Sequence, residues 1–331
     1  MKMKRILSLT LILVFLLSSI IIGYSEDQDK TYEIKLTSCD SINTIWMTKM
    51  KEACEKISVR TNGKVDIQMY PSGEMLVYDE GIEAVMSDTA VIYFTDPSLF
   101  GDYVPAYITL CAPYLYDSYE TVEKLMESDT VKAMYDNAEK AGLHAITTSF
   151  VVGVRNVLAN KPINSVEDLK GLKIRVPGVT IYTETFDALG TNWTPMPFSE
   201  VFSAMQTGVL NAVEVTPGNA YNYKIYDALD TAYYSLTKHM LNVVGLFTGE
   251  GFWQSLPEEY SSIIEEELRA AAYESNREVD STDAALIQKM VDDGVILVPI
   301  DDLSAFKAKV DPMNKKFVMY DEIVAQIASF K

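Results

Sequence analysis

LKIRVP, at residues 172–177, has the pattern of a buried β-strand that ends at a proline. Ile174 and Val176 alternate with Lys173 and Arg175, and a proline cannot donate the hydrogen bond that would continue a central strand. Strands of a layered α/β protein are normally covered on both faces, and ligands bind beyond their carboxyl ends. Arg175 is therefore expected close to a ligand crevice.

An arginine in this position has two interpretations. Its planar guanidinium can bind a carboxylate through two parallel hydrogen bonds, a geometry that lysine cannot reproduce. A strand-end arginine can equally form an ion pair with a surface acid. The strand pattern leaves both readings of Arg175 open.

The segments around this strand alternate between strand-like and helix-like patterns, which is typical of the α/β class. Strands are expected at residues 32–36, 65–69, 90–95, 144–154, 172–176, 209–215, 238–248 and 295–300. Helices are expected at residues 46–57, 81–88, 120–141, 182–189, 199–205 and 257–290, and in a C-terminal stretch interrupted at Pro312. Ser165 and Asp168 have the spacing of a capping box, and Ser199 is expected to cap the helix that follows it.

The N-terminus has the layout of a secretory signal peptide. Lys2, Lys4 and Arg5 precede an apolar run over residues 6–22, and the chain turns polar near Ser25. We expect residues 1–25 to be a cleaved signal peptide, so that the mature chain is exported to the periplasm or the extracytoplasmic face of the membrane. An uncleaved membrane anchor is the alternative, because the apolar run is about as long as the shortest spanning helix.

The composition of the chain limits the classes of molecule that it is expected to bind. The 331 residues carry a formal charge of −19, which argues against nucleic acid or anionic lipid as a partner. The three cysteines, Cys39, Cys54 and Cys111, are an odd number in an exported chain. We interpret them as small buried apolar residues, with a Cys39–Cys54 disulfide as the alternative.

Further candidate site residues lie near other predicted strand ends. Arg155 follows the apolar strand 150–154, so with Arg175 it suggests an anion site. Asp96 follows the strand that ends at Thr95. Glu214 interrupts the apolar strand 209–215, where a buried carboxylate needs a partner, so a structural ion pair and a ligand contact are both open.

Five aromatic residues near predicted strand ends or helix starts are candidates for lining a ligand slot: Tyr78, Tyr93, Trp193, Phe198 and Tyr221. Enzyme signatures are missing, since the chain has no GxSxG elbow, phosphate-binding glycine loop or HExxH motif. The two histidines, His144 and His239, are far apart, and no cysteine pair has metal-binding spacing. We therefore predict no catalytic residue, no metal and no cofactor.

Two long runs resemble a known family. KPINSVEDLKGLKIRVPG (161–178) and ETFDALGTNWTPMPFSEVFSAMQTGVLNAVE (184–214) are similar to the DctP-type solute-binding proteins of tripartite ATP-independent periplasmic (TRAP) transporters. GKVDIQMYPSGEM (63–75) and GFWQSLPEEY (251–260) extend the resemblance more loosely over most of the chain.

The resemblance implies a two-lobed periplasmic-binding-protein-like fold with crossing hinge strands, a long helix and a ligand cleft between the lobes. Lobe I is expected at residues 31–152 plus about 241–280, and lobe II at 153–240 plus about 281–331. It also implies that Arg175 clamps the carboxylate of a small organic acid, with Arg155 and Phe198 beside it and Asp96 at the third strand.

The sequence departs from the family pattern after Glu214. Many members read DGQENP where this chain has NAVEVT (211–216), so a polar contact is lost at Val215 or moved to Thr216 or Asn219. Sialic acid and C4-dicarboxylate specificities therefore do not transfer.

The resulting hypothesis is a monomeric binding protein that delivers an organic acid to the TRAP permease subunits. A ligand-binding sensor that docks on a receptor is one alternative. A secreted hydrolase or lyase that uses Glu214 and Asp96 as acid and base is another.

Overall fold

A computed structural model describes residues 30–330, which form a layered α/β structure built on one nine-stranded mixed sheet. The signal peptide expected at residues 1–25 lies outside the described residues. The strands are β1 (Tyr32–Thr37), β2 (Val65–Tyr70), β3 (Val91–Thr95), β4 (Leu143–Ala159), β5 (Lys173–Val176), β6 (Asn192–Pro195), β7 (Ala212–Val215), β8 (Tyr233–Gly249) and β9 (Ile296–Val298). The predicted α/β class is confirmed.

Helices precede, cover or connect these strands. The α-helices are α2 (Ile45–Arg60), α3 (Asp79–Met86), α4 (Ala106–Leu110), α5 (Tyr119–Met126), α6 (Asp129–Lys140), α7 (Thr180–Ala188), α8 (Val201–Gln206), α9 (Pro217–Asn222), α10 (Glu250–Gln254), α11 (Glu258–Asp292), α12 (Ser304–Asn314) and α13 (Tyr320–Ser329). Short 3₁₀ helices are η1 (Pro97–Phe100), η2 (Val166–Leu169), η3 (Phe198–Glu200) and η4 (Ile225–Ala228).

Two long crossing strands join the two halves of the sheet. The strand order is β2-β1-β3-β8-β4-β7-β5-β6, with β9 paired to β8. β4 and β8 are 17 residues long each and run antiparallel to one another. One end of this pair is flanked by β3, and the other by β7 and β9. We call the part built on β1–β3 lobe I and the part built on β5–β7 lobe II.

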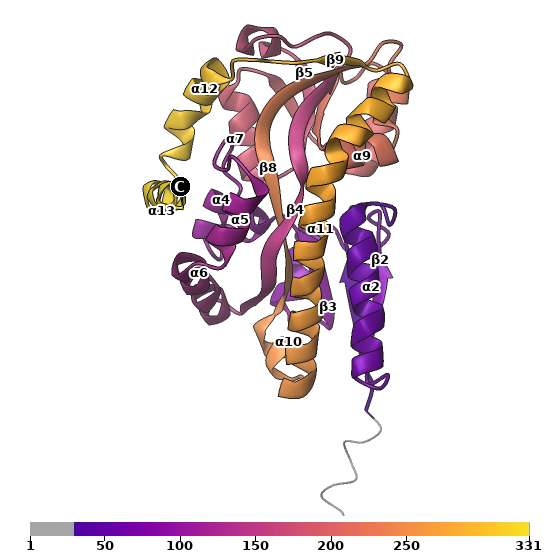
Figure 1. Cartoon of the computed structure of the whole chain (residues 1–331), viewed down its shortest axis with the longest axis vertical. Coiled ribbons are helices and arrows are strands. Elements are labelled where there is room, and N and C mark those ends of the chain that lie inside the picture. Colours follow the sequence, from indigo (N-terminus) through magenta and orange to yellow (C-terminus); the bar gives the residue numbers. More distant parts are fainter. Residues whose placement is uncertain (1–29, 331) are drawn as a thin grey trace, which may run out of the picture.

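Helices cover both faces of the sheet. In lobe I, α2 and α11 pack on one face through a core that includes Trp46 and Leu268. The other face is covered by α5, α6 and α13, with Val122 and Ile323 in their shared core. The 35-residue α11 runs alongside the crossing strands and reaches lobe II, where Met290 is fully buried (Figure 1). The crossing strands and this long helix connect the lobes, as expected.

Several local predictions are confirmed. Ser165 and Asp168 form the predicted capping box of η2. Strand β5 ends at Val176, immediately before Pro177, and β3 ends at Thr95. The helix expected from Pro257 onwards begins at Glu258 and continues to Asp292.

Other local predictions are wrong for identifiable reasons. The single helix expected at 120–141 is two helices, because the Ser128 side chain caps a new one by accepting from the amide of Val131. Ser199 lies inside η3 and makes no cap, and Pro312 lies inside α12. The C-terminal interruption falls instead at residues 315–319. Strand β4 continues five residues beyond Val154, so Arg155 lies within a strand.

The three cysteines are free thiols, so no Cys39–Cys54 disulfide forms. Cys54 and Cys111 are buried, as interpreted, whereas Cys39 is partly exposed toward the space between the lobes. Within residues 30–330, no helix is long and apolar enough to cross a membrane.

Candidate functional site

A small cavity of about 110 Å³ lies between the lobes. Lobe I contributes side chains that follow β1 and β3, lobe II contributes residues that follow β5 and β7, and the crossing strands form the floor. Its polar lining residues are Cys39, Asp40, Tyr78, Tyr93, Thr95, Asp96, Arg155, Tyr182, Asn219 and Asn242. A second crevice of about 50 Å³ adjoins it and is lined by Cys39, Tyr78, Phe198 and Tyr223, among others.

Arg175 reaches toward this space from the end of β5. Its side chain is 2% exposed. Its Nε and Nη2 atoms donate to the carbonyl oxygen of Met196 at 2.9 and 2.7 Å, and Nη2 donates to the hydroxyl of Tyr78 at 3.2 Å. The guanidinium carbon lies 5.3 Å from the ring centroid of Phe198.

No carboxylate among residues 30–330 forms an ion pair with Arg175. Burial lowers the pKa of Arg175, because the closed cleft disfavours an uncompensated charge. Of the two readings of this arginine, the surface ion pair is therefore wrong. The guanidinium is an anion-binding group without a protein anion.

Arg155 differs, because it has its own counter-ion. From β4 it forms a bidentate ion pair with Glu214 of β7. Its Nη1 donates to Asn242 Oδ1 at 2.6 Å. Nε2 of His239 lies 3.4 Å from the same carboxylate. The structural ion pair foreseen for Glu214 is present.

Two opposing effects set the pKa values of this ion pair: burial and the attraction between the two charges. Burial alone would lower the pKa of Arg155 and raise that of Glu214, but the attraction between the two charges outweighs it. The pKa of Arg155 therefore lies above its usual value and that of Glu214 below. Burial lowers the pKa of His239, so this ring is held neutral.

Asp96 lies at the carboxyl end of β3 and lines the cavity. Its Oδ1 accepts from the amide and hydroxyl of Ser98 and from the thiol of Cys111. Its Oδ2 accepts from the Tyr182 hydroxyl at 2.6 Å, a contact that crosses from lobe II to lobe I. Both oxygens of Asp96 thus have protein partners.

Two further contacts join the lobes across the cavity. The Asn219 amide donates from Nδ2 to Oδ1 of Asp40 at 3.0 Å. The hydroxyl of Tyr223 donates to the carbonyl oxygen of Cys39 at 2.9 Å. Together with the Arg175–Tyr78 and Tyr182–Asp96 bonds, they hold the lobes in a closed arrangement.

Most of the predicted site residues are brought together. Arg155, Asp96, Asn219 and Tyr93 line the cavity, and Phe198 lines the adjoining crevice. Arg175 donates a hydrogen bond to Tyr78, which lines both the cavity and the crevice. The Tyr93 hydroxyl accepts from the Tyr78 amide at 2.8 Å.

Five of the predicted contacts line neither the cavity nor the crevice beside it. Arg175 is one of them, and its hydrogen bond to Tyr78 links it to both. Glu214 lies behind Arg155 and is fully buried. Thr216 is also fully buried. It caps α9, since its hydroxyl accepts a hydrogen bond from the backbone amide of Asn219. The aromatic residues Trp193 and Tyr221 do not line this cavity or the crevice beside it.

Sequence reasoning missed Asp40, Tyr182 and Asn242. Asp40 follows the end of β1 by three residues, so the rule that placed Asp96 at a strand end could have found it. Tyr182 and Asn242 lie inside a helix and a crossing strand, and neither position carries a signal that distinguishes it from core packing.

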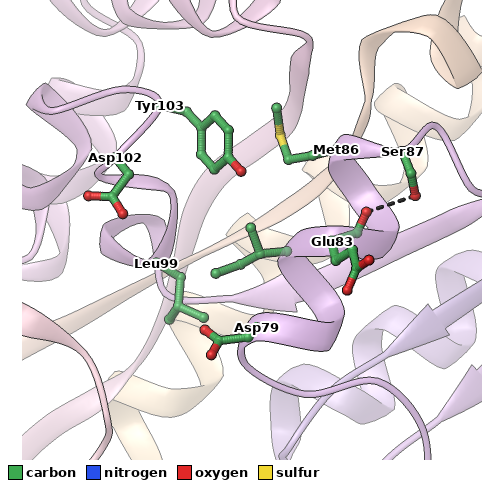
Figure 2. A pocket seen from close by; sticks show the side chains of 8 residues that line it. Asp79, Glu83, Met86, Ser87, Leu99, Asp102 and Tyr103 are labelled. Atoms are coloured by element: carbon green, nitrogen blue, oxygen red, sulfur yellow. Dashed lines mark hydrogen bonds between the residues drawn. The ribbon is translucent and has the colours of Figure 1, made fainter.

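Two other features lie outside the cleft. A hollow of about 450 Å³ lies on lobe I. Figure 2 shows Asp79 and Glu83 of α3 on one side of it and Asp102 and Tyr103 on the other. Separately, Glu139, His144 and Glu250 place potential metal-ligating atoms within 4.8 Å of one another. Here His144 is held by Glu250 at 2.9 Å and by stacking on Trp253.

Comparison with known proteins agrees with this architecture. Residues 38–321 match the family model DctP, described as bacterial extracellular solute-binding protein, family 7. A solute-binding protein of Chromohalobacter salexigens is 27% identical over 271 residues, which cover 81% of this chain and 80% of that protein.

Two solved structures are similar over nearly their whole length. A TRAP periplasmic solute-binding protein of Desulfovibrio salexigens, in complex with diglycerolphosphate, is 31% identical with a TM-score of 0.87, covering 91% of this chain and 97% of that one. One from Fusobacterium nucleatum, with bound sn-glycerol-3-phosphate, is 31% identical with a TM-score of 0.86, covering 90% and 99%. The two-lobed fold, the lining of the cleft and these matches lead to one conclusion: the chain belongs to the family 7 extracellular solute-binding proteins, the periplasmic binding components of TRAP transporters.

Proposed function

We propose that this protein captures a small organic acid outside the cytoplasm, through the Arg175 guanidinium, and delivers it to a TRAP permease. The observation that carries the proposal is a buried arginine, Arg175, with which no carboxylate of residues 30–330 forms an ion pair. An unpaired buried charge is costly, and a ligand carboxylate that accepts from Nη1, the group that the bonds to Met196 and Tyr78 leave out, reduces that cost. Each charge-assisted hydrogen bond contributes about 1.5–3 kcal/mol net.

Arg155 has a supporting role in this proposal. Because Glu214 already neutralises it, Arg155 can donate one hydrogen bond from Nη1 to the ligand without adding net positive charge. Phe198 packs beside the Arg175 guanidinium and is placed to cover an apolar part of the ligand. The cleft then has room for one anionic group, held mainly by one arginine.

We infer that the lobes close around the ligand as rigid units, with lobe I at residues 31–152 plus about 241–280 and lobe II at 153–240 plus about 281–331. The inter-lobe contacts at Tyr78, Asp96, Asp40 and Cys39 form only when the lobes are together. A ligand that bridges them favours the closed form, which the permease can recognise by its shape.

The catalytic alternative receives no support from the two carboxylates on which it would depend. Glu214 is held by Arg155 and His239, and both oxygens of Asp96 accept hydrogen bonds from protein groups. Both carboxylates are thus engaged by protein groups, and the two do not form an acid–base pair with each other. Binding without turnover is the function that this arrangement supports.

The test is a thermal-shift screen of small organic anions against ligand-free protein and against Arg175→Ala. Lys173→Ala is the matched control, because Lys173 is an exposed residue on the same strand. We expect at least one anion to raise the melting temperature of wild type and Lys173→Ala and to leave Arg175→Ala unchanged. Equal stabilisation of all three proteins would remove Arg175 from the binding mechanism.

A further inference from the structure

Three side chains that can bind a metal ion meet at the lobe I end of the crossing strands, where α6 and α10 lie (Figure 1). Glu139 lies in the last turn of α6, His144 is the second residue of β4, and Glu250 begins α10 directly after β8. One ligand atom from each lies within 4.8 Å of the other two. An imidazole nitrogen with two carboxylate oxygens is a ligand set that binds divalent transition-metal ions.

The backbone holds these three residues together. Gly142 donates from its amide to the carbonyl oxygen of Glu139 at 3.0 Å, and its own carbonyl oxygen accepts from the amide of Glu250 at 3.0 Å. His144 pairs with Thr248 across the two crossing strands. All three side chains therefore belong to one framework within lobe I, and their approach does not depend on how the lobes close.

The ring of His144 is fixed by two neighbours. It stacks on the indole of Trp253, with ring centroids 4.4 Å apart and 18° between the planes. Its Nδ1 lies 2.9 Å from Oε2 of Glu250, and the two side chains are 13% and 15% exposed. The other oxygen of Glu250 accepts from Nε2 of Gln254 at 2.6 Å. Such contacts orient ligating groups and strengthen metal binding.

A hydrogen bond between His144 and Glu250 accounts for only part of this arrangement. It gives no reason for the third side chain, Glu139, which is exposed and forms no ion pair within residues 30–330. Two carboxylates this close to one another repel, and a neutral imidazole does not offset their charge. A divalent cation between the three groups does.

The spacing of the ligand atoms indicates the kind of ion. Two ligands at right angles, each about 2.1 Å from a six-coordinate ion, lie about 3.0 Å apart, whereas tetrahedral ligands lie about 3.4 Å apart. The 2.9 Å between Nδ1 of His144 and Oε2 of Glu250 matches the first arrangement. A nitrogen ligand disfavours Mg²⁺ and Ca²⁺, which take oxygen ligands.

We propose that Glu139, His144 and Glu250 form a binding site for a six-coordinate divalent transition-metal ion, such as Ni²⁺, Co²⁺ or Mn²⁺, with water at the remaining positions. The bound ion ties α6 and α10 to the ends of both crossing strands and so stabilises lobe I. The prediction of no metal rested on the spacing of histidines and cysteines. A single histidine between two glutamates from separate segments has no such spacing.

The experiment adds Co²⁺, Ni²⁺ or Mn²⁺ to tag-free protein after dialysis against EDTA, with Mg²⁺ as the control ion. Trp253 gives a local readout, because it stacks on the ligating ring and because Co²⁺ and Ni²⁺ quench indole fluorescence at short range. We expect Co²⁺ or Ni²⁺ to bind in isothermal titration, to raise the melting temperature and to quench part of the tryptophan fluorescence. Trp253→Phe should still bind the ion but show no quenching.

Two variants test the ligand assignment. Glu139→Gln is the more decisive, since Glu139 is exposed and its replacement should not disturb folding. This variant and His144→Gln should each weaken Co²⁺ and Ni²⁺ binding by at least about tenfold. Asp129→Asn is the matched control, because Asp129 is an exposed acidic residue at the other end of α6.

The site is overturned if none of the three transition-metal ions binds with a Kd below about 1 mM. Unchanged affinity in Glu139→Gln, or in folded His144→Gln, also overturns it, as does Co²⁺ or Ni²⁺ binding that leaves the fluorescence of Trp253 unchanged. If His144→Gln does not fold, Glu139→Gln decides. None of these outcomes bears on Arg175, since the metal site shares no residue with the cleft.

Discussion

Arg155 of β4 and Glu214 of β7 form a bidentate ion pair in the floor of the cleft, although 59 residues separate them in sequence. The pair explains how an arginine and a glutamate can lie in two buried strands. It also distinguishes the two arginines of the cleft: the charge of Arg155 is compensated by Glu214, whereas that of Arg175 is not.

Removing one partner of this pair should be strongly destabilising. In Glu214→Gln the buried Arg155 loses its counter-ion, and we expect a loss of about 3–5 kcal/mol in the free energy of unfolding. Urea denaturation followed by circular dichroism measures it. The double variant Arg155→Met/Glu214→Leu should lose far less, since an apolar pair leaves no charge buried. Equal losses in the single and double variants would contradict this account of the pair.

The crossing strands also depend on a glycine. Gly153 lies within β4 at φ +104°, and a Cβ built there would be 3.0 Å from Oδ2 of Asp283. We expect Gly153→Ala to lose about 1–3 kcal/mol of stability through backbone strain and this contact. Gly171→Ala is the matched control, since Gly171 has φ +70° but nothing within 4 Å of its Cβ position. Similar losses in the two variants would show that crowding at β4 has no part in the effect.

The carboxyl group of Asp283 should make the stability of the folded protein depend on pH. Burial raises its pKa from 3.8 to about 7, with Asp280 adding to the rise, and the Val154 amide and Tyr119 hydroxyl partly oppose it. Other charged groups that line the same groove are Asp117, Glu120, Lys238 and Lys307. Because its folded-state pKa is raised, the folded protein binds this proton more tightly than the unfolded chain does. The stability that this bound proton contributes is present at low pH and is lost as the pH rises from about 4 through about 7.

Asp283→Asn should remove this dependence. Between about pH 5 and about pH 8, wild type should lose about 1–2 kcal/mol relative to the variant, a value reduced for the partial exposure of Asp283. Urea unfolding at both pH values checks it. Parallel changes in the two proteins would show that Asp283 does not titrate in this range.

Much of the fold follows from local sequence patterns. The buried strands β1, β3 and β5 were predicted within one or two residues, because period-two apolar spacing and a following turn or proline define them locally. The break at Ser128 was missed, since the apolar face continues across both helices and only the capping serine distinguishes them. The full length of β4 was missed because Arg155 resembles the end of a strand until its distant partner Glu214 is known.

The site was predicted less completely than the fold. Arg175, Phe198 and Asp96 follow from a family resemblance and from their position at strand ends. The hydrogen bond between Asp40 and Asn219 depends on how the two lobes close, and no local pattern encodes that contact. Thr216 was expected as an alternative to Asn219, but its hydroxyl caps α9, and a single sequence does not distinguish these roles.

Native mass spectrometry of the purified protein, with release and identification of any retained small molecule, tests the central claim about Arg175 most directly. The wild type and Lys173→Ala should carry the same organic anion, whereas Arg175→Ala should carry none. Arg175→Lys should retain little, since a lysine cannot reproduce the planar guanidinium that bonds Met196 and Tyr78 and still presents Nη1. An anion retained equally by Arg175→Ala and the wild type would contradict the account.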